Sequence, residues 1–151
     1  MARTAVSRRI HAPIDAVFDT VANIECFARA VPHITEVTFL TDRRSGVGTR
    51  FAETRVMRGR QATTTLEVTE YEENERIRLV SDEGGTIWDT VFTLSAVDGS
   101  NGATDLAMVM EATPYKLSAK IVNPLMKGII RRSIEGDLDA VKAYCESAAS
   151  S

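Results

Sequence analysis

The chain has 151 residues, a length typical of one domain that can bury a sizeable core, and its 44% hydrophobic and 26% charged residues are ordinary for a globular protein. Its net charge of −3 argues against a nucleic-acid-binding surface, because such a surface needs a dominant basic face. No stretch is apolar over the length that spans a bilayer, so we expect no integral membrane segment.

The N-terminal part of the chain predicts one strand followed by two short helices. Residues 4–10 alternate between apolar and polar side chains, as a strand with one buried face does. Pro13 suits the first turn of a helix, where its missing N–H costs nothing, and apolar residues follow at helical spacing from Ile14. A second short helix is expected over residues 23–30, and Pro32 ends it.

The middle of the chain predicts a run of strands joined by short turns. Turn residues, clearest at 98–102 (Asp-Gly-Ser-Asn-Gly), separate these segments. Such short connections between consecutive strands imply an antiparallel meander. The expected strands span residues 34–41, 49–57, 61–71, 76–82, 86–97 and 103–113.

The last part of the chain predicts one long helix over residues 116–146. Pro124 should kink or divide it early, and the small polar tail from about residue 147 is expected to fray. Its apolar residues form a stripe that should face the sheet. This stripe comprises Leu117, Ile121, Leu125, Ile129, Leu138, Val141 and Cys145.

Together these elements predict an α+β fold in a single domain over residues 1–151. A sheet of about seven strands twists and curls, and an apolar surface must cover its concave face. The long C-terminal helix is the element long enough to do so, but one helix cannot fill the concavity. We therefore expect a mostly apolar cavity between sheet and helix, closed at one end by the two short helices.

Side-chain alternation predicts which strand residues face this cavity. In most strands one face is bulkier and less charged, which places Trp88, for example, inside. Residues 49–57 leave the choice open, because the phase that points Phe51 inward also points Glu53 and Arg55 inward. Buried charges are costly unless paired, so these two either line the cavity as polar groups or stay hydrated at an edge or a wet mouth.

The expected cavity lining combines apolar residues with this polar pair. It comprises Phe27, Phe51, Glu53, Arg55, Leu66, Leu79, Trp88, Phe92, Met108, Met110, Leu125 and Ile129. Arg50 and Asp89 are further candidate polar anchors. Gly128 and Gly136 are unfavourable inside a helix, and they make room either for a ligand or for close packing.

Other chemistry-bearing residues give weak signals. Cys26 and His33 could form a nucleophile pair, but a packed cysteine beside an exposed loop histidine is the more ordinary interpretation. No catalytic motif, phosphate-binding loop or metal-ligand spacing occurs, so we assign no catalytic residue and expect no metal and no cofactor. Cys26 and Cys145 could pair, yet two reduced thiols and the lack of an apolar leader favour a cytoplasmic protein.

Several phrases of the sequence resemble a known superfamily. They lie at residues 10–18 (IHAPIDAVF), 46–50 (GVGTR), 88–94 (WDTVFTL) and 102–106 (GATDL). Over nearly the whole chain it resembles the START-like, or birch-allergen-like, helix-grip superfamily, and within it the polyketide cyclase/dehydrase-like (SRPBCC) group. Residues 18–32 also look like the coenzyme-Q-binding branch, which carries a tryptophan near the proline where this chain has His33. The resemblance implies a helix-grip fold and brings no catalytic motif with it.

Three functions are compatible with these features. The leading hypothesis is non-catalytic binding or carriage of a small hydrophobic ligand, such as a lipid, isoprenoid or aromatic compound, by a monomer or homodimer. The second is a polyketide cyclase or dehydratase, which a polar cluster deep in the cavity would favour. The third is a protein-interaction module, like coenzyme-Q-binding or ribosome-association relatives, which a filled core and a large exposed apolar patch would favour.

Overall fold

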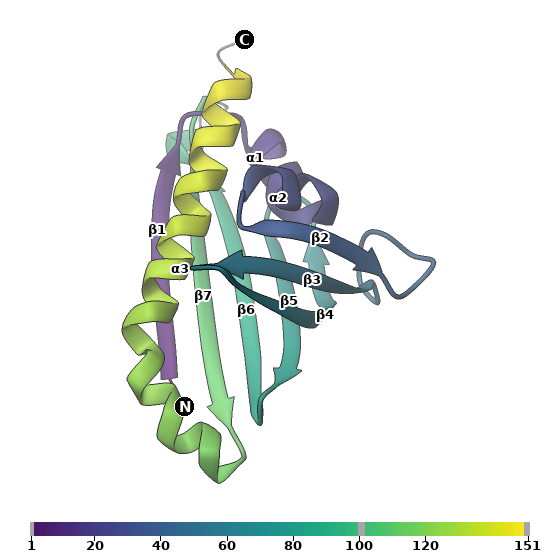
Figure 1. Cartoon of the computed structure of the whole chain (residues 1–151). Coiled ribbons are helices and arrows are strands. Elements are labelled where there is room, and N and C mark those ends of the chain that lie inside the picture. The colour runs from purple at the N-terminus through teal and green to yellow at the C-terminus, as the bar shows by residue number, and fades with distance from the viewer. Residues whose placement is uncertain (1, 100–101, 150–151) are drawn as a thin grey trace.

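The computed structural model describes residues 2–99 and 102–149, and the elements follow the expected order (Figure 1). They are β1 (Ala2–Ile10), α1 (Ile14–Ala22), α2 (Ile24–Ala30), β2 (Ile34–Phe39), β3 (Arg50–Met57), β4 (Arg60–Glu72), β5 (Arg76–Glu83), β6 (Thr86–Ala96), the short turn η1 (Val97–Gly99), β7 (Thr104–Pro114) and α3 (Leu117–Ala149). Within the described residues, seven strands form one antiparallel sheet in the order β1-β7-β6-β5-β4-β3-β2. The expected α+β helix-grip architecture is confirmed.

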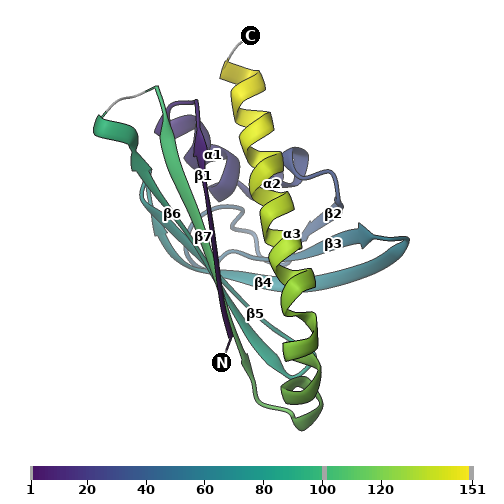
Figure 2. The ribbon, with the colours of Figure 1, turned by 90° about the vertical axis from the view of Figure 1, so that its left-hand side faces the viewer.

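The first strand completes the sheet beside the last one. β1 pairs with β7 from Ala2 opposite Ala112 to Ile10 opposite Thr104. The chain then crosses through α1 and α2 to β2 at the other edge of the sheet, and these two short helices lie at one end of its concave side (Figures 1 and 2). The later strands follow one another as a meander, so inward residues lie opposite inward residues on the next strand, except at the register shifts between Ile34 and Glu36 and between Val68 and Glu70.

Two tight hairpin turns set the pairing of the central strands. Arg58 and Gly59 join β3 to β4, and Gly84 and Gly85 join β5 to β6; all four residues have positive φ. Positive φ at both central residues gives a turn whose twist matches that of the paired strands. Glycine adopts this conformation without strain, which explains its place in both turns.

The C-terminal half of α3 packs across the concave side of the sheet (Figure 2). Ile134, Leu138, Val141 and Cys145 are all at most 3% exposed. The thiol of Cys145 donates a hydrogen bond to the hydroxyl of Thr20 in α1 at 3.3 Å, and burial raises the pKa of this thiol. This half of α3 therefore joins the sheet and the short helices in one core.

The N-terminal half of α3 does not follow the expected stripe. Leu117, Ile121, Leu125 and Ile129 are 74%, 62%, 79% and 46% exposed, so the prediction that they face the sheet was wrong. Each four-residue step overshoots a full helical turn by about 40°, so a row of such residues winds around the helix. A stripe that starts at Leu117 therefore departs from the side that Leu138 buries.

Three smaller expectations concern α3 and one turn. Of the two outcomes expected at Pro124, a kink or a division, the structure has a bend: α3 is continuous from Leu117 to Ala149, and its first turns bend away from the rest in Figure 1. The expected fraying from residue 147 is not found through Ala149, and residues 150–151 lie outside the described part. The expected turn at 98–102 begins within η1. Its residues 100–101 lie outside the part of the chain that the structure describes.

Leu138→Ala should lower the free energy of unfolding by about 3 kcal/mol, because it removes a fully buried side chain between α3 and the sheet. Leu125→Ala on the same helix should change it by less than about 0.5 kcal/mol, because Leu125 is 79% exposed. Urea unfolding followed by circular dichroism measures both values. Equal losses would show that a different side of α3 meets the sheet.

Candidate functional site

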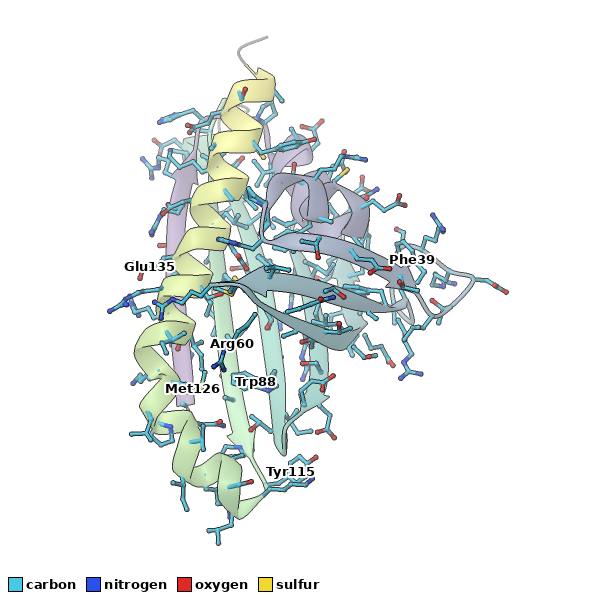
Figure 3. The ribbon with its side chains drawn as sticks, viewed as in Figure 1. Phe39, Arg60, Trp88, Tyr115, Met126 and Glu135 are labelled. Carbon is cyan, nitrogen blue, oxygen red and sulfur yellow. The ribbon has the colours of Figure 1, made fainter. Side chains whose placement is uncertain are left out.

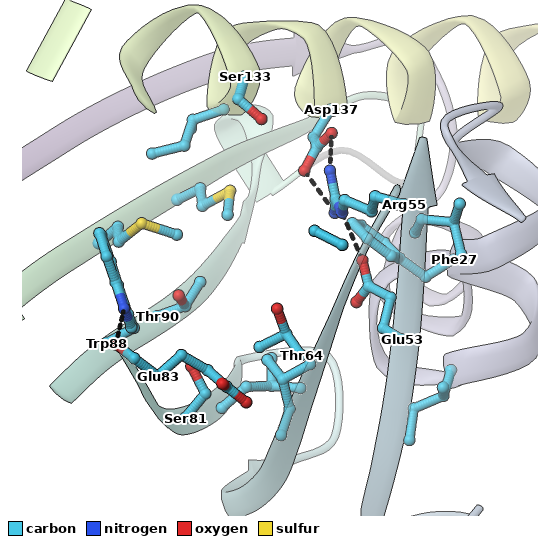
Figure 4. Close-up of a pocket in the computed structure, with 18 of the residues that line it drawn as sticks. Phe27, Glu53, Arg55, Thr64, Ser81, Glu83, Trp88, Thr90, Ser133 and Asp137 are labelled. Carbon is cyan, nitrogen blue, oxygen red and sulfur yellow. Dashed lines mark hydrogen bonds and ion pairs between the residues drawn. The ribbon is translucent and has the colours of Figure 1, made fainter. Parts of the chain in front are cut away.

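A cavity of about 430 Å³ lies between the concave face of the sheet, the short helices and α3 (Figure 4). Its walls come from α1, α2, the strands β2 to β7 and the middle of α3. Most lining side chains are apolar, and a few polar ones gather on the walls. This size and composition are typical of sites for small organic molecules, which measure roughly 300–1,000 Å³.

Most residues predicted for the lining come together on these walls. They are Phe27, Phe51, Glu53, Arg55, Leu66, Leu79, Trp88, Phe92, Met108 and Met110. The sheet register explains the grouping, because Phe51 lies opposite Leu66, and Phe92 lies opposite Met108. Directly opposed residues point to the same face of a sheet, so each correct inward assignment brings its partner with it.

Aromatic side chains close one end of the cavity and mark the other. The ring of Phe27 in α2 packs edge-on against Phe92 with centroids 5.8 Å apart, which seals the end beneath the short helices. Trp88 is half-buried, and its Nε1 donates a long hydrogen bond of 3.4 Å to the carbonyl of Glu83. Arg60, labelled in Figure 3, lines the cavity together with Trp88 and is exposed, so we place the mouth at this part of the lining.

An ionic cluster links β3 to α3 on the cavity wall (Figure 4). Arg55 Nη1 and Nη2 donate to Oδ1 and Oδ2 of Asp137 at 2.9 Å each, and Arg55 Nε donates to Oε1 of Glu53. The side chains of Arg55, Asp137 and Glu53 are only 23%, 7% and 11% exposed. The open question about β3 is thereby answered: its charged pair points inward, and Asp137 supplies the partner that makes this burial tolerable.

The electrostatics of this cluster make Arg55 a permanent cation. Burial by itself lowers the pKa of Arg55, but attraction and hydrogen bonds from Asp137 and Glu53 outweigh it and raise that pKa above its ordinary value. A guanidinium of this kind stays protonated near neutral pH and therefore does not act as an acid or a base. With both carboxylates charged the cluster carries a net charge of −1, and three of the five guanidinium N–H groups are engaged, which leaves two for a ligand.

Hydroxyl groups add further hydrogen-bonding capacity. Thr64, Ser81, Thr90 and Ser133 line the cavity on β4, β5, β6 and α3. Within residues 2–99 and 102–149, none of these four hydroxyls bonds to another protein group. They can therefore donate to or accept from a bound molecule without breaking an existing protein contact.

The contribution of α3 to the cavity was only partly anticipated. Ile130, Ile134 and Asp137 line it, in place of the predicted Leu125 and Ile129, which lie exposed outside it. The error comes from extending the apolar stripe over the whole helix. Counting back in steps of three and four residues from the buried C-terminal half of α3 reaches the correct side, and this signal was present in the sequence.

Two charged candidates lie on the outer face of the sheet instead. Asp89 accepts hydrogen bonds from Arg78, and this contact lowers the pKa of Asp89 below its usual value. Arg50 lies 3.5 Å from Glu67 in an exposed ion pair. Neither Arg50 nor Asp89 lines the cavity, so both are removed from the set of candidate anchors.

The remaining candidates also lie away from the cavity. His33 is exposed and is not part of the lining. A Cβ at Gly128 or Gly136 would meet no atom within 4 Å, and both positions are exposed, so these glycines do not make room for a ligand. Cys26 and Cys145 are free thiols. No group of three or more His, Cys, Asp or Glu side chains in the described part of the chain is arranged to hold a metal ion.

Asp137→Ala should lower the free energy of unfolding by about 3 kcal/mol, because it leaves the buried Arg55 without its bidentate partner. Asp139→Ala is the matched control on α3: it removes an ion pair with Arg8, but its side chain is 60% exposed, so the loss should stay below about 1 kcal/mol. Urea unfolding gives both values. A loss no larger for Asp137→Ala than for Asp139→Ala would contradict the buried cluster.

Comparison with known proteins adds a family and a shared fold. A family model described as polyketide cyclase / dehydrase and lipid transport matches residues 1–146. A search of curated proteins found no match. Similar solved structures include the Zhui aromatase/cyclase from Streptomyces sp. R1128, with 16% identity over 96% of this chain and 93% of that chain and a TM-score of 0.79.

Two further structures show the same arrangement. A START superfamily protein from Mycobacterium smegmatis is 15% identical over 97% of this chain and 98% of that chain, with a TM-score of 0.78. The protein TTHA0849 from Thermus thermophilus is 16% identical over 98% of this chain and 99% of that chain, also with a TM-score of 0.78. At these identities the structures show a common fold and nothing finer. The family model spans almost the whole chain, and the chain therefore belongs to the polyketide cyclase/dehydrase and lipid transport family.

Proposed function

We propose that this protein binds one small, largely apolar and uncharged molecule, with a hydroxyl or carbonyl group at one end, inside the cavity. The observation that supports this most directly is a cavity of about 430 Å³ with apolar walls and one buried polar cluster. Each methylene buried against such walls contributes about 0.8 kcal/mol, and a few placed polar groups orient the ligand. Lipid, isoprenoid and aromatic or polyketide-like compounds have this chemistry.

The charge of the wall disfavours anionic ligands. The cluster of Glu53, Arg55 and Asp137 sums to −1, and the further lining charges of Arg60 and Glu83 cancel each other. A carboxylate or phosphate would therefore meet a net negative wall in a weakly screened apolar site. A hydroxyl group can instead donate to a carboxylate of the cluster, and a carbonyl can accept from an unused N–H of Arg55.

A polyketide cyclase or dehydratase is the second candidate, and the ionic cluster is the observation that favours it. A carboxylate such as Asp137 could accept a proton from a carbonyl-activated carbon, and the guanidinium of Arg55 could stabilise the resulting enolate. The family description and the similar aromatase/cyclase structure agree with this class. Binding stays the primary proposal because Glu53 and Asp137 already accept hydrogen bonds from Arg55.

A neutral aromatic alcohol should bind more tightly than the matching acid. We expect the dissociation constant of 2-naphthol at pH 7 to be at least about tenfold lower than that of 2-naphthoate, because the wall repels the carboxylate. Displacement of Nile red measures both constants. Glu53→Gln, which removes one negative charge from the wall, should narrow the difference. Tighter binding of the naphthoate to the wild-type protein would contradict the proposed ligand charge.

Filling the cavity should abolish binding without unfolding the protein. Ser133→Phe places a ring in the cavity and should weaken Nile red binding at least about tenfold. Ser7→Phe on an exposed position of β1 is the matched control and should leave binding unchanged. Melting temperatures verify that both variants fold. Unchanged affinity of folded Ser133→Phe would place the ligand elsewhere.

A turnover assay tests the cyclase candidate. If the protein converts a poly-β-carbonyl compound and Arg55→Met abolishes this turnover, catalysis replaces ligand carriage as the primary proposal.

A further inference from the structure

The N-terminal half of α3 exposes an apolar face to solvent. Leu117 and Leu125 are 74% and 79% exposed, and no other exposed large hydrophobic side chain in the described residues reaches these values. Proteins rarely expose large apolar patches that are contiguous unless the patch meets a partner. The patch, which we call the outer face of α3, comprises Leu117, Ile121, Val122, Leu125, Met126 and Ile129.

The helical geometry makes these residues one surface. Leu117, Ile121, Leu125 and Ile129 follow at four-residue intervals, so they form a single row that winds slowly around the helix. Val122 fills the space beside this row. The side of α3 that faces the sheet is already occupied by other residues, so the outer face is not a displaced part of the core.

Positive charge surrounds the outer face. Residues 112–134 contain five Lys or Arg and no Asp or Glu, so the net charge of −3 divides into +5 for this segment and −8 for the rest of the chain. Lys120 and Arg132 are exposed and lie three residues after Leu117 and Ile129, so each flanks one end of the apolar row. Carboxylates do approach the ends of the segment, since Glu135 lies 3.9 Å from Arg131 and Asp82 accepts a hydrogen bond from Tyr115. Lys120 and Arg132 take part in neither of these contacts.

This combination selects one kind of partner. We propose that the outer face of α3 docks the protein on a membrane surface that contains anionic lipids. Apolar side chains enter the interface of the bilayer while the flanking Lys120 and Arg132 meet the lipid phosphates. A second copy would oppose two positively charged segments, and a nucleic acid would leave the apolar row uncovered. No described helix is long and apolar enough to cross a bilayer, so the contact is peripheral.

Docking in this way would bring the cavity close to the lipid. Ile130 and Ser133, which belong to the same stretch of α3, line the cavity. A ligand could then exchange between bilayer and cavity over a short path. This link to ligand exchange rests on the proposed binding function, whereas the docking itself does not.

Co-sedimentation with lipid vesicles tests the docking surface. The wild-type protein should bind phosphatidylcholine vesicles that contain about 30% phosphatidylglycerol, and pure phosphatidylcholine at least about tenfold more weakly. Higher salt should weaken the binding. Leu125→Asp should reduce it at least about tenfold at an unchanged melting temperature, because this side chain is exposed in the free protein.

A charge-matched pair of variants separates the surface from net charge. Lys120→Glu with Arg132→Glu should weaken vesicle binding by more than about 25-fold, since each cation near the surface contributes about fivefold. Arg43→Glu with Arg44→Glu makes the same change of net charge in the β2–β3 loop and should have little effect. Equal losses in the two variants, or no binding of folded wild-type protein to anionic vesicles, would overturn the proposal.

Two further results decide between this surface and its alternatives. A concentration-dependent dimer in analytical ultracentrifugation that Leu125→Asp abolishes, without vesicle binding, would identify a second copy as the partner and overturn the membrane. Ser133→Phe, which fills the cavity, should still bind anionic vesicles. Docking would then stand even if the proposed ligand binding failed.

Discussion

The structure depends on a single helix that has to cover the concave side of a curved seven-stranded sheet. A helix with its side chains is about 10 Å wide, far narrower than the sheet it faces. Contact is complete where Ile134, Leu138 and Val141 of α3 are buried against the sheet and the short helices. Elsewhere helix and sheet cannot meet, and the cavity of about 430 Å³ is the consequence.

The pairing of Arg55 with Asp137 makes a polar wall possible inside this apolar space. β3 must place Phe51 in the core, and strand alternation then carries Glu53 and Arg55 to the same face. Two buried charges two residues apart satisfy each other only in part, and Asp137 from α3 adds a bidentate contact. The same cluster that permits this burial also sets the chemistry offered to a ligand: one fixed cation between two carboxylates.

The two sides of α3 serve different surroundings. Its inner side joins the core and the cavity wall, while the outer face in its N-terminal half presents leucine and isoleucine beside lysine. An open cavity and an exposed apolar face occur together here, although they were expected to favour different functions. A protein that takes up an apolar ligand at a lipid surface would use both.

The sequence by itself determined the order of the elements, the meander and the inward face of most strands, because turn residues and two-residue alternation are local signals. Trp88 and Phe92 were placed on the cavity side for this reason. The inward phase of β3 was decided by the tertiary structure alone, since the partner of Arg55 lies 82 residues away in α3. For α3 the sequence carried part of the answer, because Leu125 and Leu138 are thirteen residues apart and therefore lie on different sides of the helix. Both are equally apolar, so which of the two sides meets the sheet was decided by tertiary packing, which buries Leu138 and leaves Leu125 79% exposed.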